Sequence, residues 1–504
     1  MFAVDGMEYT RMGSRSHKEF LCRAGRIPIH GLGLSVDIHS PDLPSLLRSL
    51  QARQVPPAYF EVFYTEPAAL RVVREQIGQR FLAYHGEGLW ITQPEMVGSW
   101  ADRQELDDAI THLQILQSAW LNHECATKYL AGYSYGTYLP PLYTRAAAET
   151  VAENAWQIQT LLDERCALAN GSTPLLLVEM PPLTYFVAGT LPIPVFFRLL
   201  TQRAPCGLVL DVGHLWTVFR YSGAYRTSSL EAFVRLFLDE FPLDRVVEIH
   251  VAGLAIHESH MDAASAQARS AYGGPLSAWT DAHAAPIPPV LFDMLDQILS
   301  HPRLTSLKGM ALEVDMKSEE LIVEEFSGFS QRYSNVFERV TVKKDLPSEL
   351  EIHPTREEAV SPSEQQGLGV LYDRYARVVA GRAEPVGTEW DHGQACFDEL
   401  DLYRFSYLPY EILHWGGKVS DMFPESCQGL MALHVPLAEF VPFWFREPRS
   451  LSGTYDFFLL KVERFVEFVR EVAPTLEAIA EREAEGLRQG YRAANIPHGA
   501  VQVH

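Results

Sequence analysis

The sequence is poor in cysteine and lacks long apolar runs. Six cysteines are spread over 504 residues, and no two of them form a Cys-x-x-Cys pair. This spacing argues against a disulfide framework and against a structural zinc knuckle. No run of about 18 apolar residues is present, and the charged N-terminal segment contains no apolar core of a signal peptide. We therefore expect a soluble, cytoplasmic protein with no membrane contact.

Basic residues are also in deficit. The chain has 42 Lys and Arg against 64 Asp and Glu, a formal net charge of −22. Because no basic stripe offsets this charge, nucleic acid is not expected as a partner. Charged residues make up 21% and apolar residues 47% of the chain, a globular balance. The length suits one barrel-sized unit of about 250 residues or more together with a smaller domain.

The most informative stretch is CGLVLDVGHLW, residues 206–216. An apolar run ends in Asp211, and His214 follows three residues later. A run without alternation predicts a strand that is buried on both faces. Asp211 and His214 would then lie where the strand ends, and both could bind one metal ion. An isolated Asp-x-x-His is more often a helix cap and a loop histidine, so the metal interpretation depends on the other strands.

Seven further segments read as strands, and a helical segment follows each strand. The eight expected strands are 27–38, 59–64, 81–89, 119–125, 175–179, 206–211, 246–251 and 310–315. Regular alternation of buried strands and helices predicts an α/β fold, a (β/α)8 TIM barrel, over residues 27–343. In such a barrel the chemistry gathers at the carboxyl ends of the strands.

Metal-ligand residue types stand at the ends of six consecutive strands. They are His85, His123, Glu124, Glu179, Asp211, His214, His250 and Glu313, with Asp281 and His283 in a loop after the seventh strand. Taken singly, each has an ordinary structural interpretation. Together they predict more than one cation, because many buried carboxylates are otherwise too costly. Sites of this composition suit iron, manganese or zinc. Glu61 is expected to be structural or to orient a ligand, while His30 and His39 are open between loop and site.

At this point the motifs carry a resemblance. GLGLSVD, FEV, His85-Gly, Glu179, LDVGH, EIHVAG, DAH and LEVD together resemble the DUF692 family, the multinuclear non-heme iron-dependent oxidases, over about residues 27–330. The resemblance implies a TIM barrel with two or three irons that uses O2 to modify cysteine or other residues of a ribosomally made peptide. It implies metal ligands at His85, Glu179, Asp211, His214, His250, Asp281, His283 and Glu313. Asp211, His250 and Asp281 are the expected catalytic residues.

Two positions depart from the family pattern. Many members have Ser-Glu-His-Leu at the fourth strand, where residues 122–125 read Asn-His-Glu-Cys. The ligand there is therefore either His123 or Glu124. Many members also have Asn-Asn after the aspartate of the sixth strand, where this chain has Gly-His. His214 can still ligate, but the number or geometry of the irons can differ.

The loop after the fourth strand, GYSYGTYLPP, is aromatic and punctuated by glycine. One interpretation is that Tyr133, Tyr135 and Tyr138, with Tyr84 from the third strand, line the mouth of the barrel. The other is a packed surface loop. Substrate-binding residues and the oligomeric state do not follow from the sequence.

The chain outside the barrel divides into three parts. Residues 1–26 are expected to be a loose N-terminal leader, and the polar, Pro- and Glu-rich segment 344–367 reads as a linker. Residues 368–504 are expected to form a mainly helical domain, with a break or kink at Pro474. Family members commonly work with a separate protein that presents the peptide. The helical domain either takes that role or caps the barrel or forms a dimer.

Two other classes of protein fit the same rim of residues. A xylose-isomerase-like or endonuclease-IV-like TIM barrel would use manganese or zinc for proton transfer or hydrolysis. A binding protein would keep the metal site without turnover. The acidity of the chain disfavours the nuclease, and the family-like motifs favour the oxidase over the isomerase.

Overall fold

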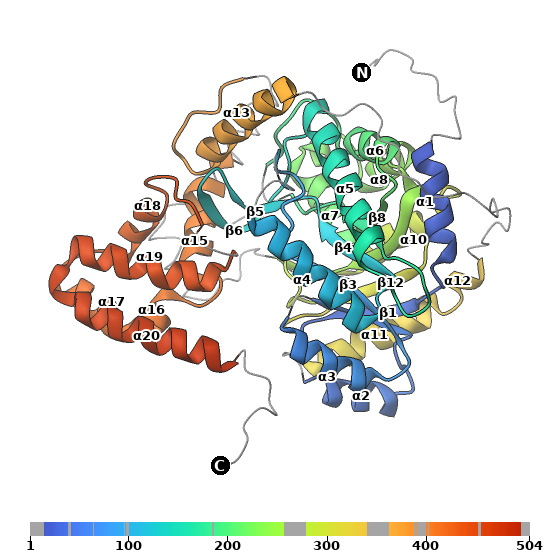
Figure 1. Cartoon of the computed structure of the whole chain (residues 1–504), viewed down its shortest axis with the longest axis horizontal. Helices are drawn as coiled ribbons and strands as arrows, with labels where there is room; N and C mark the ends of the chain where they lie inside the picture. Colours follow the sequence, from blue (N-terminus) through green and yellow to red (C-terminus); the bar gives the residue numbers. More distant parts are fainter. Residues whose placement is uncertain are drawn as a thin grey trace.

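The structure is a computed structural model of the chain and has two parts, a closed barrel and a helical region that we call the C-terminal unit (residues 362–494) (Figure 1). It describes residues 15–38, 42–63, 65–94, 96, 100–183, 186–256, 279–339, 362–387, 390, 400–401, 403–451 and 455–494. Among these residues, no helix combines the length and the apolarity that a membrane crossing needs.

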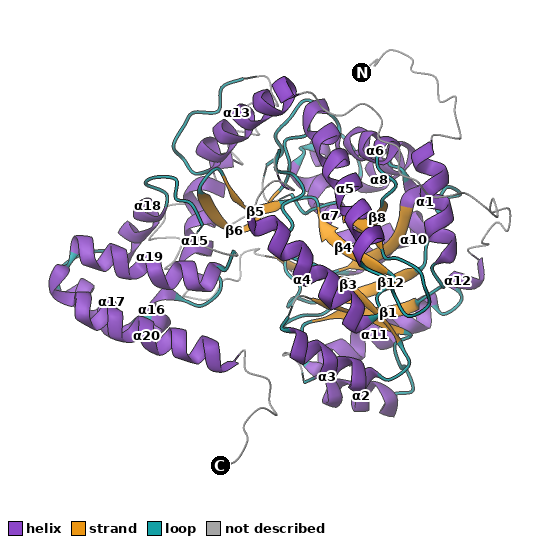
Figure 2. Cartoon of the chain, in the orientation of Figure 1, coloured by secondary structure: helices purple, strands orange, loops and turns teal. Residues whose placement is uncertain are grey.

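Eight parallel strands close into a barrel in the order β1-β12-β9-β8-β7-β4-β3-β2. They are β1 (Gly31–Val36), β2 (Tyr59–Phe63), β3 (Phe81–His85), β4 (Trp120–Glu124), β7 (Leu175–Glu179), β8 (Gly207–Asp211), β9 (Val246–Val251) and β12 (Gly309–Glu313). All eight predicted strands are present, and the predicted TIM barrel is confirmed. Figure 2 shows the strands enclosed by helices.

The surrounding helices follow the strands in chain order. They are α2 (Leu43–Ala52), α3 (Pro67–Ile77), α4 (Trp100–Leu116), α5 (Arg145–Arg165), α6 (Ile193–Arg203), α7 (Val212–Tyr221), α8 (Leu230–Glu240), α10 (Pro289–Ser300), α11 (Glu319–Tyr333) and the short α12 (Val336–Arg339). The amphipathic helices bury one apolar face each. In α3 this face consists of Leu70, Val73 and Ile77.

The barrel interior is apolar at the amino ends of the strands and polar at the carboxyl ends. A buried apolar cluster at the amino ends contains Tyr59, Ala83, Trp120, Val209 and Ala311. Side chains two residues apart in a strand share a face. The residues two positions further along these same strands are Glu61, His85, Asn122, Asp211 and Glu313. The polar site therefore stands on an apolar floor, which holds its side chains in place and excludes water from below.

Helix α1 (Arg15–Arg26) closes the amino end of the barrel. Phe20 is fully buried in the floor cluster, and the Arg23 guanidinium donates hydrogen bonds to Asp163 at 2.6 and 2.7 Å. The prediction of a loose leader is therefore wrong for residues 15–26, and residues 1–14 lie outside the described part. Residues 15–26 include few apolar residues, so the sequence gave little indication that this short helix covers the barrel.

His30 lies at this same amino end, away from the polar site. Its ring stacks on Phe81 at 4.4 Å and packs against Trp120 at 4.2 Å between ring centroids. Burial lowers the pKa of His30 to about 4. His30 is thus a packed histidine of the floor, while His39 lies outside the described residues.

Two antiparallel hairpins interrupt the alternation of strands and helices. β5 (Thr127–Leu130) pairs with β6 (Tyr133–Leu139) directly after β4, where the sequence predicted a loop. β10 (Leu254–Ile256) pairs with β11 (Trp279–Asp281) after β9. Both hairpins therefore rise from the carboxyl ends of barrel strands, beside the polar site.

The C-terminal unit is helical, as predicted. Its elements are α13 (Pro362–Val379), η5 (Tyr403–Tyr407), α15 (Leu408–His414), α16 (Val419–Met422), α17 (Pro424–Ala432), η6 (Leu437–Glu439), α18 (Phe440–Trp444), α19 (Phe457–Val472), η7 (Pro474–Leu476) and α20 (Glu477–Ala494). The predicted break at Pro474 is confirmed, since α19 ends just before it. α13 begins at Pro362, so the end of the predicted linker is helical, and residues 344–361 lie outside the described part.

The C-terminal unit packs on the β5–β6 hairpin (Figure 1). The Trp444 indole donates to the Ser134 carbonyl at 2.8 Å, and the Tyr135 hydroxyl donates to the Ala376 carbonyl at 2.7 Å. Gly136 has a positive φ of 76°, and a Cβ there would meet the Phe457 ring at 2.7 Å. One continuous buried apolar core runs from the barrel into the C-terminal unit. The two parts therefore stabilise one another.

Candidate metal centre

A cluster of imidazoles and carboxylates fills the carboxyl end of the barrel. Its buried members are Glu61, His85, Glu124, Glu179, Asp211, His214, Glu248, His250 and Glu313. His283 joins them from the segment after β11, with a side chain that is 23% exposed. Because the barrel brings the carboxyl ends of all parallel strands together, residues from several strands and one helix meet here.

Glu179 is the hub of this cluster. Its Oε1 lies 3.5 Å from His250 Nδ1 and 3.5 Å from His214 Nδ1. Its Oε2 lies 3.5 Å from His85 Nε2 and accepts a 2.8 Å hydrogen bond from the Asn122 amide. One carboxylate thus faces three imidazoles, an arrangement suited to bridging neighbouring cations.

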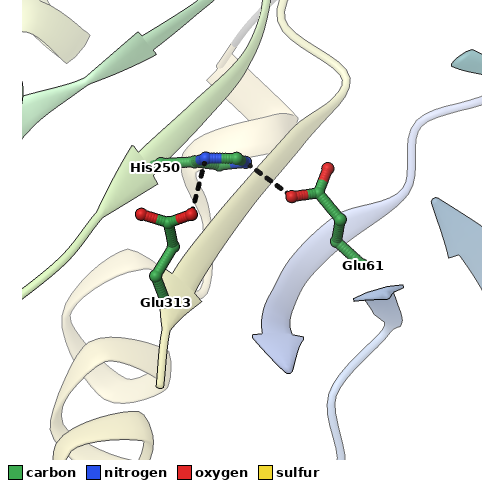
Figure 3. A group of neighbouring side chains, drawn as sticks. All are labelled: Glu61, His250 and Glu313. Atoms are coloured by element: carbon green, nitrogen blue, oxygen red, sulfur yellow. Dashed lines mark ion pairs between the residues drawn. The ribbon is translucent and has the colours of Figure 1, made fainter. Parts of the chain in front are cut away.

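Three subsets of the cluster are compact enough for one ion each. In two of them the candidate ligand atoms lie within 4.8 Å of one another: Glu179, Asp211 and His214 form one, and Glu61, His250 and Glu313 form the other. In the second, Glu61 faces Nε2 and Glu313 faces Nδ1 of the His250 ring, so an ion there would bind His250 with the carboxylate on one side (Figure 3). In the third, His85 Nε2 lies 3.7 Å from Glu124 Oε2 and 3.5 Å from Glu179 Oε2. Ligands bonded to one metal at about 2.1 Å are separated by roughly 3.0–3.5 Å. The observed spacings are close to this range, so the residues fit metal ions.

In three histidines of the cluster, Nδ1 contacts a polar group that is not a member of the cluster. His85 Nδ1 donates to the Gly86 carbonyl at 3.1 Å, and His214 Nδ1 donates to the Met180 carbonyl at 2.7 Å. His283 Nδ1 lies 2.6 Å from Asp315 Oδ1. A carbonyl only accepts, so Nδ1 carries the proton in His85 and His214 and Nε2 keeps its lone pair. This is the usual way in which proteins orient a metal-binding histidine.

His123 has other partners. Its Nε2 accepts a 3.0 Å hydrogen bond from the Leu89 backbone N–H, and its Nδ1 donates to the Glu124 carbonyl at 2.9 Å. Burial lowers the pKa of His123 to about 4. Both ring nitrogens are therefore used by the backbone. Of the two alternatives at the fourth strand, the structure places the side chain of Glu124 in the cluster and that of His123 outside it.

Asp211 combines the two roles that its sequence allowed. Its Oδ1 accepts a 2.6 Å hydrogen bond from the His214 backbone N–H and so caps α7. The same Oδ1 lies 3.9 Å from His214 Nε2. Capping therefore fixes the side chain where it faces the cluster. The backbone of Asp281 ends β11, but the side chain of Asp281 lies outside the described part of the chain.

The charges of the cluster partly offset one another. Burial favours a neutral Glu179, but the imidazoles of His250, His85 and His214 outweigh burial and hold the pKa of Glu179 well below its usual range. Burial opposes a charged His85, yet Glu124, Glu179 and Glu61 raise its pKa to about 10. Burial opposes a charged His250 as well, but Glu61, Glu179, Glu313 and Glu248 raise its pKa well above its usual value. Protons on His85 and His250 thus offset part of the carboxylate charge.

Several buried atoms still lack a hydrogen bond. Within the described residues, Glu61 Oε2, Glu124 Oε2, Glu313 Oε2 and both ring nitrogens of His250 have no hydrogen-bond partner. Buried polar atoms are rarely left in this state, because each costs about 1–3 kcal/mol. Bound cations would satisfy the carboxylate oxygens and one ring nitrogen of His250, which supports a metal centre.

Of the tyrosines considered for the mouth, Tyr138 reaches the cluster. Burial, then the charges of Glu124 and Glu87, and then a hydrogen bond to the Glu124 carboxylate raise the pKa of Tyr138 well above its usual value. The Lys128 ammonium lies 4.4 Å from the centre of the Tyr138 ring and pairs with Glu87. Tyr84 instead faces away from the cluster, with its hydroxyl 2.7 Å from His112 Nδ1.

Sequence reasoning missed Glu248 and Asn122. Glu248 lies two residues before His250 in β9, and its Oε2 is 3.6 Å from His250 Nε2. Asn122 lies two residues before Glu124 in β4 and holds Glu179. Both follow from the alternation of side chains in a strand, applied backwards from the predicted ligands. The same rule separates Glu124 from His123.

The fold and the site together define a TIM barrel with a buried histidine and carboxylate cluster at the carboxyl ends of its strands. Residues 43–325 match the family model described as "RiPP precursor modification enzyme MbnB/TglH/ChrH", where RiPP denotes a ribosomally synthesised and post-translationally modified peptide. This match covers more than half of the chain. The chain belongs to this family, the DUF692 family that the motifs resemble.

Curated relatives support the assignment over parts of their length. A UPF0276 protein of Rhizobium meliloti is 33% identical over 135 residues, 27% of this chain and 36% of that protein. A UPF0276 protein of Vibrio parahaemolyticus is 22% identical over 272 residues, 53% of this chain and 79% of that protein. The chain spans about a third to a half of the length of the first curated relatives it matches.

Solved structures resemble the barrel only distantly. Endonuclease IV from Thermus thermophilus is 17% identical, with a TM-score of 0.34, covering 61% of this chain and 98% of that chain. A sugar phosphate isomerase/epimerase from Parabacteroides distasonis is 11% identical, with a TM-score of 0.33, covering 61% and 95%. The assignment of a TIM barrel here rests on the strand order itself.

Alanine substitutions at residues 123 and 124 are expected to have different effects. Glu124→Ala removes a carboxylate of the cluster and should cost one bound ion. His123→Ala leaves the Leu89 N–H without its acceptor, so it should lower stability by about 1–3 kcal/mol and keep the metal content. Metal analysis and urea unfolding of both variants measure this. Loss of metal from His123→Ala, with full retention in Glu124→Ala, would reverse the assignment.

Metal binding is expected to release protons and to strengthen with rising pH. His85, with a pKa raised to about 10, and His250, raised well above its usual value, hold protons at neutral pH before a metal binds. A metal needs the deprotonated nitrogen, so each pH unit gained below those pKa values should raise the affinity about tenfold for each proton released. Titration of the metal-depleted protein with Mn2+ at about pH 6.5 and about pH 8.5, both below the raised pKa of His85, tests this. Equal affinity at both values would contradict it.

Proposed function

We propose that this protein is an iron-dependent oxidase that uses O2 to modify a residue, with cysteine as the expected target, of a ribosomally synthesised peptide. Family membership supports a peptide substrate. The observation that carries the metal part is Glu179, a buried carboxylate that faces three imidazoles. Two or three irons are proposed as the cofactor and O2 as the co-substrate.

The cluster offers three positions for the ions. His85, Glu124 and Oε2 of Glu179 would hold the first, and Asp211, His214 and Oε1 of Glu179 would hold the second. His250, Glu313 and His283 surround the third, where His283 Nε2 lies 3.4 Å from Glu313 Oε2. The predicted catalytic roles of Asp211, His250 and Asp281 remain proposals. Ferrous ions held there would supply the open coordination positions and the electrons that O2 chemistry needs.

The residues of the chain would orient, shield and balance this chemistry. The backbone carbonyls of Gly86 and Met180 fix the rings of His85 and His214. The apolar floor around Tyr59 and Trp120 closes the site from below, so a substrate reaches it from the hairpin side. Tyr138 would hold Glu124 in place at that mouth through its hydroxyl. A thiolate bound there would be held close to its reaction partner, which is a large part of catalysis.

We also propose that the C-terminal unit forms a wall of this mouth. It grips the β5–β6 hairpin, which carries both Lys128 and Tyr138. This contact supports a capping role for the unit. Presentation of the peptide, by this unit or by a separate partner protein, and a cytoplasmic location remain predictions.

The experiment is oxygen uptake by the anaerobically iron-reconstituted protein. The probe is a synthetic version of a short cysteine-bearing peptide encoded beside the gene. We expect O2 consumption that depends on the peptide and a mass change at one of its residues. An iron-loaded protein that consumes no O2, yet is active on a sugar or a phosphodiester with Mn2+ or Zn2+, would contradict the proposal.

A further inference from the structure

His250 differs from the other histidines of the cluster in having carboxylates at both ring nitrogens. Nδ1 faces Glu313 Oε1 at 3.3 Å and Glu179 Oε1 at 3.5 Å. Nε2 faces Glu61 Oε1 at 3.2 Å and Glu248 Oε2 at 3.6 Å. Figure 3 shows the ring lying between Glu61 on one side and Glu313 on the other. The lone pairs of the two nitrogens diverge, so a single ion binds only one of them.

The carboxylates on the Nε2 side are held by hydroxyl groups. The Ser35 hydroxyl donates to Glu61 Oε1 at 3.0 Å, and the Tyr59 hydroxyl donates to Glu248 Oε1 at 2.6 Å. The Tyr59 ring packs closely on Gly33, where a Cβ would lie 2.4 Å from it. No second imidazole of the described cluster has an ion pair with Glu248, and His250 is the one that pairs with Glu61. Two fixed carboxylates therefore lie beside Nε2, with Glu61 Oε1 the nearer at 3.2 Å, while neither Nε2 nor Glu248 Oε2 has a hydrogen-bond partner among the described residues.

The carboxylates on the Nδ1 side belong to the shared part of the cluster. Glu179 also faces His85 and His214, and Glu313 also faces Nε2 of His283. In those three histidines Nδ1 lies against the Gly86 carbonyl, the Met180 carbonyl and Asp315, and in His214 the same Nδ1 is also 3.5 Å from Glu179 Oε1. His250 has no such backbone partner among the described residues, so its orientation must come from the carboxylates beside it.

We propose that His250 binds its ion through Nδ1, opposite to His85, His214 and His283, and that Glu248, held by Tyr59, is the positioning residue that fixes its Nε2–H. Glu61, whose Oε1 lies 3.2 Å from Nε2, is a second acceptor for the same proton. This inference rests on the proposed metal centre. A positioning role for Glu248 explains why a second buried carboxylate lies beside Nε2 of His250, where Glu61 alone would suffice as an acceptor.

The test is proton NMR of the full chain loaded with Co2+, which shifts the signals of ligand imidazoles. The ring C–H at Cδ2 is adjacent to Nε2 and not to Nδ1. An exchangeable N–H signal with a nuclear Overhauser effect to a sharp shifted C–H signal therefore reports Nδ1 ligation. We expect one imidazole of this kind, while the other ligand histidines lack that effect.

Two substitutions, Glu248→Gln and the milder Tyr59→Phe, then test whether this imidazole is that of His250. Both should speed solvent exchange of that one N–H by about tenfold or more and release one ion to a chelator about 10–100 times faster. The matched control is Tyr84→Phe, a buried tyrosine that pairs with His112 outside the cluster.

The outcomes separate the inference from its basis. Shifted imidazole signals that all show Nε2 ligation, or an N–H unaffected by both substitutions, would overturn the inference and leave the metal centre intact. The absence of any shifted imidazole signal after Co2+ loading would overturn the metal centre itself.

Discussion

Glu179→Ala is expected to lose at least two metal ions at once. The carboxylate lies 3.5 Å from imidazoles of three different elements, so its removal takes a ligand from neighbouring positions together. Removing a group that merely orients a ligand costs about 10–100-fold in metal affinity, and we expect a shared ligand to cost more than about 100-fold. Elemental analysis after gel filtration measures the loss, and peptide-dependent O2 uptake should disappear with it.

The matched control for this variant is Glu149→Ala. Glu149 pairs with Arg203 at 2.9 Å on the outer helices of the barrel, away from the cluster. It should keep the full metal content. A Glu179→Ala protein that is folded and loses only a single ion would show that Glu179 binds one position and does not bridge.

His250→Ala is expected to abolish metal at one position and turnover together. His250 is fully buried, and four carboxylates of the cluster lie within 3.6 Å of its nitrogens. Its loss therefore leaves several buried carboxylates without their balancing charge, which is among the most destabilising changes in a protein interior. Metal content, O2 uptake and thermal unfolding should all fall.

His112→Ala controls for the loss of a buried histidine. His112 is 1% exposed on α4 and pairs with Tyr84, so it should lower stability without changing the metal content. A His250→Ala protein that is fully active and replete with iron would contradict the assignment of His250.

Much of the fold and the site could be predicted because both depend on one simple pattern. Apolar runs such as Leu208–Leu210 that end in an acid or a histidine mark buried parallel strands, and a barrel brings all such ends together. Eight strands and the collection of His85, Glu179, Asp211, His214, His250 and Glu313 at one rim followed from this pattern alone.

The remaining features depend on contacts that the sequence does not display. Whether His123 or Glu124 faces inward depends on which of the alternating side chains of β4 point into the barrel. Trp120 and Asn122 point inward, so Glu124, two residues further, does so as well. Helix α1 covers the floor of the barrel because Phe20 packs into the apolar cluster there. The contact between the C-terminal unit and β6 joins residues such as Ser134 and Trp444, which are distant in the sequence.

The measurement that tests the central claim most directly is the metal content of the protein, purified without added metal and again after anaerobic reconstitution with ferrous iron, with a Mössbauer spectrum of the same sample. The account predicts two or three irons per chain with antiferromagnetic coupling between them. Stoichiometric zinc or manganese that persists after reconstitution, with no iron bound, would contradict it.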